Sequence, residues 1–188
     1  MGWDARVSYA GTYPDRVRAI ITIDAGPIAE EHASAEEANA LRRLDRREQD
    51  RLVELEKRKA ADPVGTFAEM QRATLGAYFY DARKALTAAT WLTGDSNLEV
   101  MRLGYEPAFG SLNSFIRARL HSIRAPVLLV HGRQDAVPEG GVVEAHQLIK
   151  SSRLAFIDKC GHVPWIEQPE ELRKAVEAFI TMSQTQTK

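Results

Sequence analysis

Three short apolar runs along the chain predict buried strands. They occupy residues 19–24, 126–130 and 153–158, and each is followed by polar or turn-forming residues. Runs of this length without polar alternation are typical of parallel strands that are covered on both faces. Amphipathic helices are predicted near residues 142–149 and from Pro169 onward, where apolar residues recur at helical spacing. The pattern therefore predicts an α/β fold with a parallel sheet and flanking helices.

The first residues of the chain fit two patterns. Trp3, Ala5, Val7 and Tyr9 alternate with other residues as in a strand, whereas Trp3, Val7 and Ala10 also share one face of a helix. The hydrophobic pattern leaves both structures open.

A long polar stretch separates the first two predicted strands, from residue 28 to residue 122. Ser34 and Glu37 have the spacing of a capping box, and they predict the start of a long charged helix. Thr66 and Glu69 predict a second such start, and Ser96–Asn–Leu–Glu99 a third. The block is far longer than an ordinary crossover between parallel strands, so we expect a helical insertion with solvated charged faces.

Two side chains that could take part in catalysis follow the second and third strands. Asp135 and His162 each lie in the loop after a predicted strand, at the sheet edge where open α/β sheets bind ligands. A carboxylate that orients an imidazole is half of a nucleophilic hydrolase site. We therefore expect Asp135 and His162 to lie within hydrogen-bonding distance of each other.

These two segments resemble the last third of an α/β-hydrolase. The resemblance is carried by Pro-Val-Leu-Leu-Val-His-Gly-Arg-Gln-Asp at 126–135 and Cys-Gly-His-Val-Pro-Trp-Ile-Glu-Gln-Pro-Glu-Glu at 160–171. In that family the chain order is nucleophile, acid and histidine. The resemblance implies that Asp135 is the catalytic acid and His162 the catalytic base.

The start of the chain is similar to the helix behind the family's nucleophile turn. The stretch Tyr-Ala-Gly-Thr-Tyr-Pro-Asp-Arg-Val at 9–17 carries this resemblance, which favours helix over strand for the first residues. In this register Gly2 matches the second glycine of the turn, and the nucleophile precedes Met1. The resemblance thus implies a partial fold that is truncated and inactive as the isolated chain. Ser8 and Ser111 are poor substitutes, because neither occupies a strand-to-helix turn. Asp4 is another, because it lacks the turn's second glycine and lies too close to Tyr13-Pro14.

The helical insertion resembles the cap of α/β-hydrolases, which implies three regions. They are the start of the hydrolase core at 1–27, the cap at 28–122, and the C-terminal core at 123–188 with the acid and the histidine. The acidic cap and the segment around His162 look most like the proline-iminopeptidase branch, whose members hold a substrate amine with cap carboxylates. Glu69, Glu99 and Glu106 are the candidates for that role.

The composition of the chain limits the classes of partner and cofactor that it can be expected to bind. The chain has 188 residues, with 25 Lys and Arg against 26 Asp and Glu, so no bulk charge attracts nucleic acid or an anionic membrane. One cysteine, Cys160, excludes an internal disulfide and fits a cytoplasmic protein. The histidines lack metal-ligand spacing, so we expect no metal and no cofactor. The family resemblance implies a small-molecule substrate.

Three functions remain open at this point. The first is a serine hydrolase of ester, amide or N-terminal peptide bonds. The second is an epoxide- or halide-processing hydrolase with an aspartate nucleophile, in which His162 would activate water. The third is a non-catalytic fragment or association module, because the expected nucleophile precedes Met1. Separately, the strand at 19–24 would lack an outer neighbour, which favours self-association.

Overall fold

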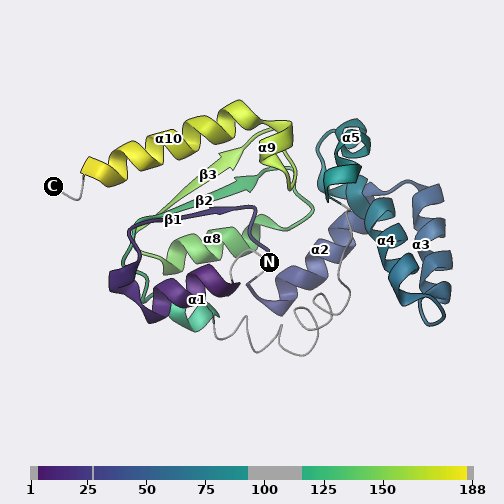
Figure 1. Cartoon of the computed structure of the whole chain (residues 1–188), viewed down its shortest axis with the longest axis horizontal. Helices are drawn as coiled ribbons and strands as arrows, with labels where there is room; N and C mark the ends of the chain where they lie inside the picture. Colours follow the sequence, from purple (N-terminus) through teal and green to yellow (C-terminus); the bar gives the residue numbers. More distant parts are fainter. Residues whose placement is uncertain (1–3, 27, 93–115, 186–188) are drawn as a thin grey trace.

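The described part of the chain forms a three-stranded parallel sheet in the order β1-β2-β3 (Figure 1). The computed structural model describes residues 4–26, 28–92 and 116–185. The strands are β1 (Ile20–Ile23), β2 (Val127–Gly132) and β3 (Ser152–Ile157). Ile20 lies opposite Val127, and Val130 lies opposite Ala155. The predicted parallel sheet is confirmed, with strand boundaries shifted by one or two residues.

Alternate residues of the central strand face two different cores. Val127 and Leu129 pack towards α1 (Asp4–Thr12) and α8 (Glu139–Leu148). Leu128 and Val130 pack towards α10 (Pro169–Thr185) on the other face. Since β2 is buried along its whole length, both faces of its sequence are apolar.

The ambiguous first segment is helical from Asp4 to Thr12, as the family resemblance favoured. Val7 and Ala10 are buried on one side of α1, whereas Tyr9 is 46% exposed. This spacing of three residues between buried positions is helical, and it excludes the strand alternative for the described residues.

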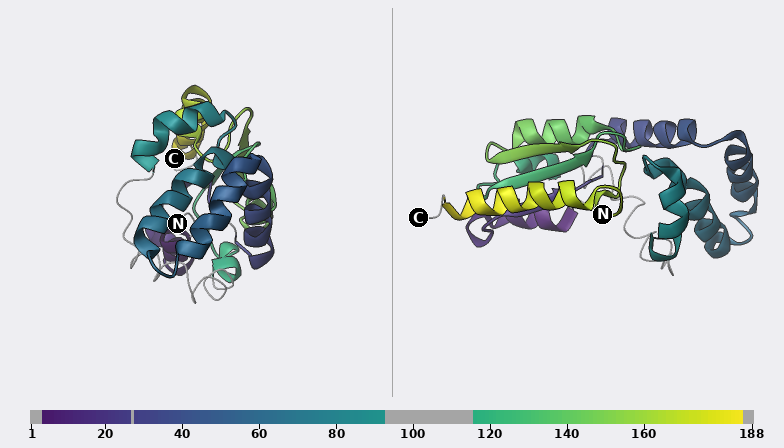
Figure 2. Two further views of the ribbon diagram at one scale, coloured as in Figure 1. Left: turned by 90° about the vertical axis from the view of Figure 1, so that its right-hand side faces the viewer. Right: turned by 90° about the horizontal axis from the view of Figure 1, so that it is seen from above.

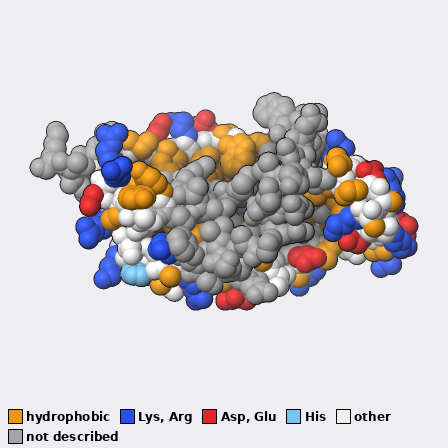
Figure 3. All heavy atoms as spheres, turned by 60° about the horizontal axis from the view of Figure 1, so that its bottom comes forward, with side chains coloured by type: hydrophobic (Ala, Val, Ile, Leu, Met, Phe, Trp, Pro, Cys, Tyr) orange, Lys and Arg blue, Asp and Glu red, His pale blue; other side chains and the backbone are white. Residues whose placement is uncertain are grey.

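A set of helices separates β1 from β2 in the chain, and we call it the helical insertion. Its described members are α2 (Glu30–Arg43), α3 (Arg46–Arg58), α4 (Pro63–Thr74), the short 3₁₀ helix η2 (Leu75–Tyr78) and α5 (Ala82–Leu92). In Figure 1 and in the right-hand view of Figure 2 the insertion extends past the end of the sheet to which the strands point. Acidic and basic side chains intermix over its far end, at α3 and α4 (Figure 3). That distribution fits the solvated charged faces expected from the sequence.

Two predicted helix starts in the insertion are wrong. Ser34 lies inside α2, which already begins at Glu30, and Thr66 lies inside α4, which begins at Pro63. The capping box belongs instead to Asp45, whose side chain accepts a hydrogen bond from the Glu48 amide at 2.8 Å. Asp45 therefore divides the predicted long helix into two. The third predicted start, at Ser96, lies outside the described residues.

Candidate active site

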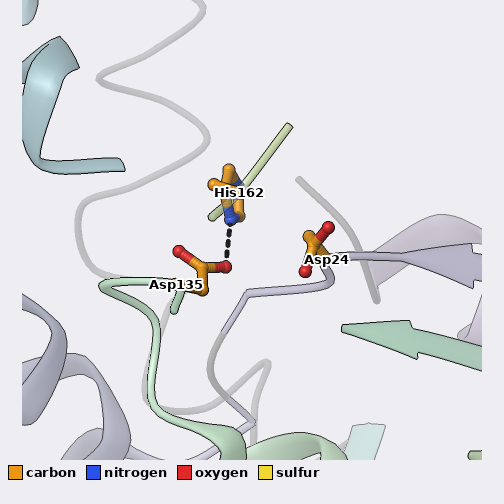
Figure 4. A group of neighbouring side chains, drawn as sticks. All are labelled: Asp24, Asp135 and His162. Atoms are coloured by element: carbon orange, nitrogen blue, oxygen red, sulfur yellow. Dashed lines mark hydrogen bonds and ion pairs between the residues drawn. The ribbon is translucent and has the colours of Figure 1, made fainter. Parts of the chain in front are cut away.

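Three polar side chains meet at the carboxyl end of the sheet (Figure 4). Asp24 directly follows β1, Asp135 follows β2, and His162 follows β3. One ligand atom from each of them lies within 4.8 Å of one from each of the others. Parallel strands bring these loops together, because their carboxyl ends share one edge of the sheet.

Asp135 is fixed by a tight turn after β2. Its backbone amide donates to the Gly132 carbonyl at 3.1 Å, and its Oδ1 accepts from the Val137 amide at 3.1 Å. Its Oδ2 lies 2.7 Å from Nδ1 of His162, and its side chain is fully buried. The turn also requires glycine at position 132, since a Cβ there would overlap the backbone carbonyl of Gly161. The carboxylate is thus held rigidly, with one oxygen available to the imidazole.

His162 is held by backbone and side chain together. Its amide donates to the Tyr78 carbonyl at 2.7 Å, and the two rings meet edge-on at 5.7 Å between centroids. Burial alone lowers the pKa of His162, but the hydrogen bond to Asp135 and its charge outweigh that effect and raise the pKa above its usual value. Among the described residues Nε2 has no hydrogen-bond partner, and the side chain is 33% exposed. Nε2 is therefore the nitrogen that can exchange a proton with a ligand.

Glu167 anchors the His162 loop, and we did not assign it a role from the sequence. This buried carboxylate accepts hydrogen bonds from the amides of Gly161 at 2.6 Å, Asp81 at 2.9 Å and Tyr80 at 3.1 Å. Lys84 donates to its backbone carbonyl at 3.0 Å. Glu167 therefore ties the loop after β3 to the helical insertion. Its partners in the insertion are 83 to 87 residues away along the chain, so no local pattern indicates them.

Asp24 is the second residue that the sequence analysis missed. It lies in the left-handed region with φ 43°, and its Oδ1 accepts from the Gly132 amide at 2.8 Å. Burial, reinforced by the charge of Asp135, raises the pKa of Asp24 to about 7. The sequence could have indicated Asp24, because it follows a predicted parallel strand just as Asp135 and His162 do.

Other candidates do not join this cluster or cannot be placed. Glu69 pairs with Arg58 at 3.1 Å and Arg51 at 3.5 Å. Glu99, Glu106 and Ser111 lie outside the described residues, as do Met1 and Gly2, and the side chains of Asp4 and Ser8 are not described either. Cys160 is buried, and burial raises the pKa of its thiol to about 12, so it remains a neutral packing residue.

Within the described part of the chain, Asp24, Asp135 and His162 are also the three side chains placed to share a cation. Nδ1 of His162, however, already forms a hydrogen bond with Asp135. A cation held by that nitrogen would have to break the bond that orients the ring. The arrangement is better suited to proton transfer than to metal binding.

Comparison with known proteins gives the family. The family model described as alpha/beta hydrolase fold matches residues 7–169, and the chain belongs to this family. Two pimeloyl-[acyl-carrier protein] methyl ester esterases are similar in sequence. The one from Nitrosomonas europaea is 35% identical over 67 residues, which are 35% of this chain and 27% of that protein. The one from Aromatoleum aromaticum is 37% identical over 65 residues, 34% of this chain and 26% of that protein.

Solved structures show the same fold at lower identity. Proline iminopeptidase of Mycobacterium smegmatis aligns with a TM-score of 0.63 at 15% identity, over 97% of this chain and 62% of that one. The N-acyl homoserine lactone degrading enzyme Est816 aligns with a TM-score of 0.60 at 19% identity, over 92% and 62%. The chain thus spans less than two thirds of the proteins it resembles. None of the helices in the described ranges has the length and apolarity needed to cross a membrane.

Proposed function

We propose that Asp135 and His162 are the acid and the base of a serine hydrolase that cleaves ester or amide bonds. The observation that carries this proposal is the 2.7 Å contact between Asp135 Oδ2 and His162 Nδ1. It fixes the tautomer, because a carboxylate accepts the Nδ1 proton and leaves the lone pair on Nε2. A neutral imidazole with a bare, partly exposed Nε2 is a general base.

The chemistry follows from that tautomer. Nε2 takes the proton of a serine hydroxyl as its oxygen attacks the substrate carbonyl carbon, and the Asp135 carboxylate stabilises the imidazolium that forms. The imidazolium then protonates the leaving alcohol or amine, and an acyl-serine remains. Water attacks this ester with His162 again as base, which releases the acid and restores the serine.

The nucleophile belongs to the part of the site that the described residues do not provide. The register of Gly2 against the family's nucleophile turn assigns the serine to the position encoded just before Met1. We therefore propose that the serine is supplied from outside the described residues, at the position that this register indicates.

The substrate side of the site is formed by the helical insertion, to which we assign the role of the family's cap. A hollow of about 770 Å³ lies among α2, α3 and α4, and Tyr78 borders both this hollow and His162. The Tyr78 hydroxyl donates to Glu36 at 2.9 Å, and burial raises the pKa of this carboxyl. The remaining lining includes apolar side chains such as Leu52 and Met70. The similar proteins named as methyl ester esterases support an ester as the substrate class.

Covalent labelling tests the proposal. The chain as given and a version extended upstream in its own reading frame are treated with a fluorophosphonate and with a p-nitrophenyl ester. We expect stoichiometric labelling and an acyl burst only in the extended protein, at a serine directly before Met1. Labelling of the chain as given at Ser8 or Ser111 would overturn the assignment of the nucleophile. An acyl burst without fluorophosphonate labelling would instead support the aspartate-nucleophile alternative.

Matched variants test the roles of the pair. In the extended protein His162→Ala should abolish the burst, whereas His146→Ala should leave it unchanged. His146 is exposed and bonded to Ser152 at 2.8 Å, away from the site. Equal bursts in the two variants would remove His162 from the mechanism.

A further inference from the structure

A second carboxyl–imidazole contact lies beside the first. Nδ1 of His131, in β2, lies 3.4 Å from Oδ1 of Asp24, at the end of β1. Both side chains are almost fully buried, at 2% and 0% exposed. The His131 ring packs edge-on against Phe156 at 6.1 Å between centroids, so it cannot turn towards solvent without unpacking β3.

The hydrogen bond of the His131 ring shows which of its two nitrogens carries the proton in the neutral imidazole. Its Nε2 lies 3.2 Å from the Val137 carbonyl, which can only accept, so Nε2 carries a hydrogen. In the neutral ring Nδ1 is then a bare lone pair, and it faces the carboxyl oxygen of Asp24. Two acceptors facing each other in a buried site repel, and Oδ2 of Asp24 has no hydrogen-bond partner among the described residues. One additional proton, on the imidazole or on the carboxyl, removes this conflict.

We propose that Asp24 and His131 form a buried pair that holds one shared proton at neutral pH and positions the charge of Asp135 towards His162. Asp24 is joined to the same turn as Asp135, because its Oδ1 also accepts the Gly132 amide at 2.8 Å. While the shared proton is present, the pair carries no net negative charge. Of the two aspartates beside His162, Asp135 is then the one that carries a charge. The proposal for the shared proton does not depend on the hydrolase activity, whereas its effect on His162 as a base rests on it.

The charged groups around the pair support this assignment. Asp135, Glu167 and His162 act on Asp24, and Asp135, His162 and Glu139 act on His131. Burial is the largest cause in both: it raises the pKa of Asp24 and lowers the pKa of His131. A buried carboxylate close to Asp135 is thus disfavoured, and so is a free imidazolium. A proton held between the two satisfies both preferences.

Loss of the shared proton would change His162. The Asp24 carboxylate would then lie beside Asp135 and would strengthen the hold of His162 on its own proton. His162 would become a poorer proton acceptor at Nε2. The two protonation steps are therefore coupled, and the titration of His162 reports on Asp24.

Nuclear magnetic resonance of the whole chain tests the pair without any need for turnover. The protein is labelled with ¹⁵N at histidine and with ¹³C at the aspartate carboxyls, and it is titrated between pH 4 and 9. We expect either a carboxyl signal of Asp24 that remains protonated well above the ordinary aspartate value of about 4, or a His131 Nδ1 that is protonated near pH 7. A bare Nδ1 together with an Asp24 carboxyl that ionises near its ordinary value would overturn the proposal.

Asp24→Asn provides the matched variant. Asparagine tolerates the left-handed backbone and keeps an oxygen for the Gly132 amide, but it cannot ionise. In wild type we expect the His162 titration to be broadened towards high pH as the pair loses its proton, and in this variant we expect a single step that is complete at lower pH. The control, Asp158→Asn, removes an exposed carboxylate paired with Arg133 at 3.1 Å and should leave the His162 titration unchanged. Superimposable His162 titration curves in wild type and Asp24→Asn over the whole pH range would exclude the coupling. If the variant does not fold, the wild-type signals of Asp24 and His131 still decide the shared proton. A missing acyl burst in the extended protein would bear on the proposed function alone.

Discussion

Asp135 and His162 are 27 residues apart in the chain, and their side chains are joined by a 2.7 Å contact between Oδ2 and Nδ1. The contact depends on the pairing of β2 with β3, which places the two loops next to each other. It also depends on Gly132, since a Cβ there would overlap the backbone carbonyls of Cys160 and Gly161 in the other loop. The geometry of the pair is thus a property of the sheet edge and not of either loop alone.

Replacing Asp135 with asparagine should lower the pKa of His162. The amide retains the shape but removes the charge, and its NH₂ group favours the tautomer with a bare Nδ1. In wild type the raised pKa of His162 contributes stability below the unfolded-state value of about 6.5. This stability is lost as the pH rises through the folded-state pKa.

The His162 ring titration and the free energy of unfolding between pH 5 and 9 check this prediction. In Asp135→Asn the pH dependence of stability in this window should become flatter. An unchanged His162 midpoint would show that Asp135 does not govern the imidazole.

Replacing Glu167 with glutamine should destabilise the fold by about 1–3 kcal/mol. The amide cannot accept from all three backbone donors, so at least one buried N–H of Gly161, Tyr80 or Asp81 loses its charged partner. Urea denaturation measures the difference. Glu170→Gln is the control, because Glu170 pairs with Arg173 on the surface of α10 and its loss should have no measurable effect. Equal stabilities of the two variants would contradict an anchoring role for Glu167.

Replacing Gly161 with alanine should destabilise the protein by about 1–3 kcal/mol. The new Cβ would overlap the Tyr78 carbonyl and would lie 2.9 Å from the Cα of Phe79, so the loop or η2 must shift. Gly26→Ala is the matched control, since nothing lies within 4 Å of a Cβ at that position. Thermal denaturation compares the two variants, and a Gly161→Ala protein as stable as wild type would show that the contact between loop and insertion yields easily.

The first strand should drive self-association of the chain. In the described part of the sheet β1 pairs only with β2. The Ile20 amide donates to the Pro126 carbonyl at 2.9 Å, and the Asp24 amide donates to the Val130 carbonyl at 2.9 Å. The alternation of a parallel ladder directs the N–H groups of Ile21 and Ile23 away from β2, where they can pair with another chain.

Sedimentation velocity over a range of concentrations tests this prediction. Ile23→Pro removes an outward donor and should shift the chain towards monomer, whereas Ile23→Val keeps the donor and should not. A wild-type chain that stays monomeric at high concentration would refute association through β1.

Some features of this protein follow from local sequence alone. The apolar runs that form β1, β2 and β3 are continuous, because parallel strands are buried on both faces, and this pattern needs no knowledge of the neighbours. The positions of Asp135 and His162 after two such strands were enough to predict their contact. The long polar stretch before residue 122 was enough to predict a helical insertion.

The tertiary structure decided the rest, for two physical reasons. The start of a helix depends on which of several capping side chains fits the packing. Asp45 therefore caps α3, whereas Ser34, which was expected to cap a helix, lies inside α2. Buried polar groups also acquire their roles from distant partners. Asp24 was read as the end of a strand and Glu167 as part of a motif. Only the folded chain places Asp24 against His131 and Gly132, and Glu167 against backbone amides more than 80 residues away, because burial forces each carboxyl to find a proton or a donor.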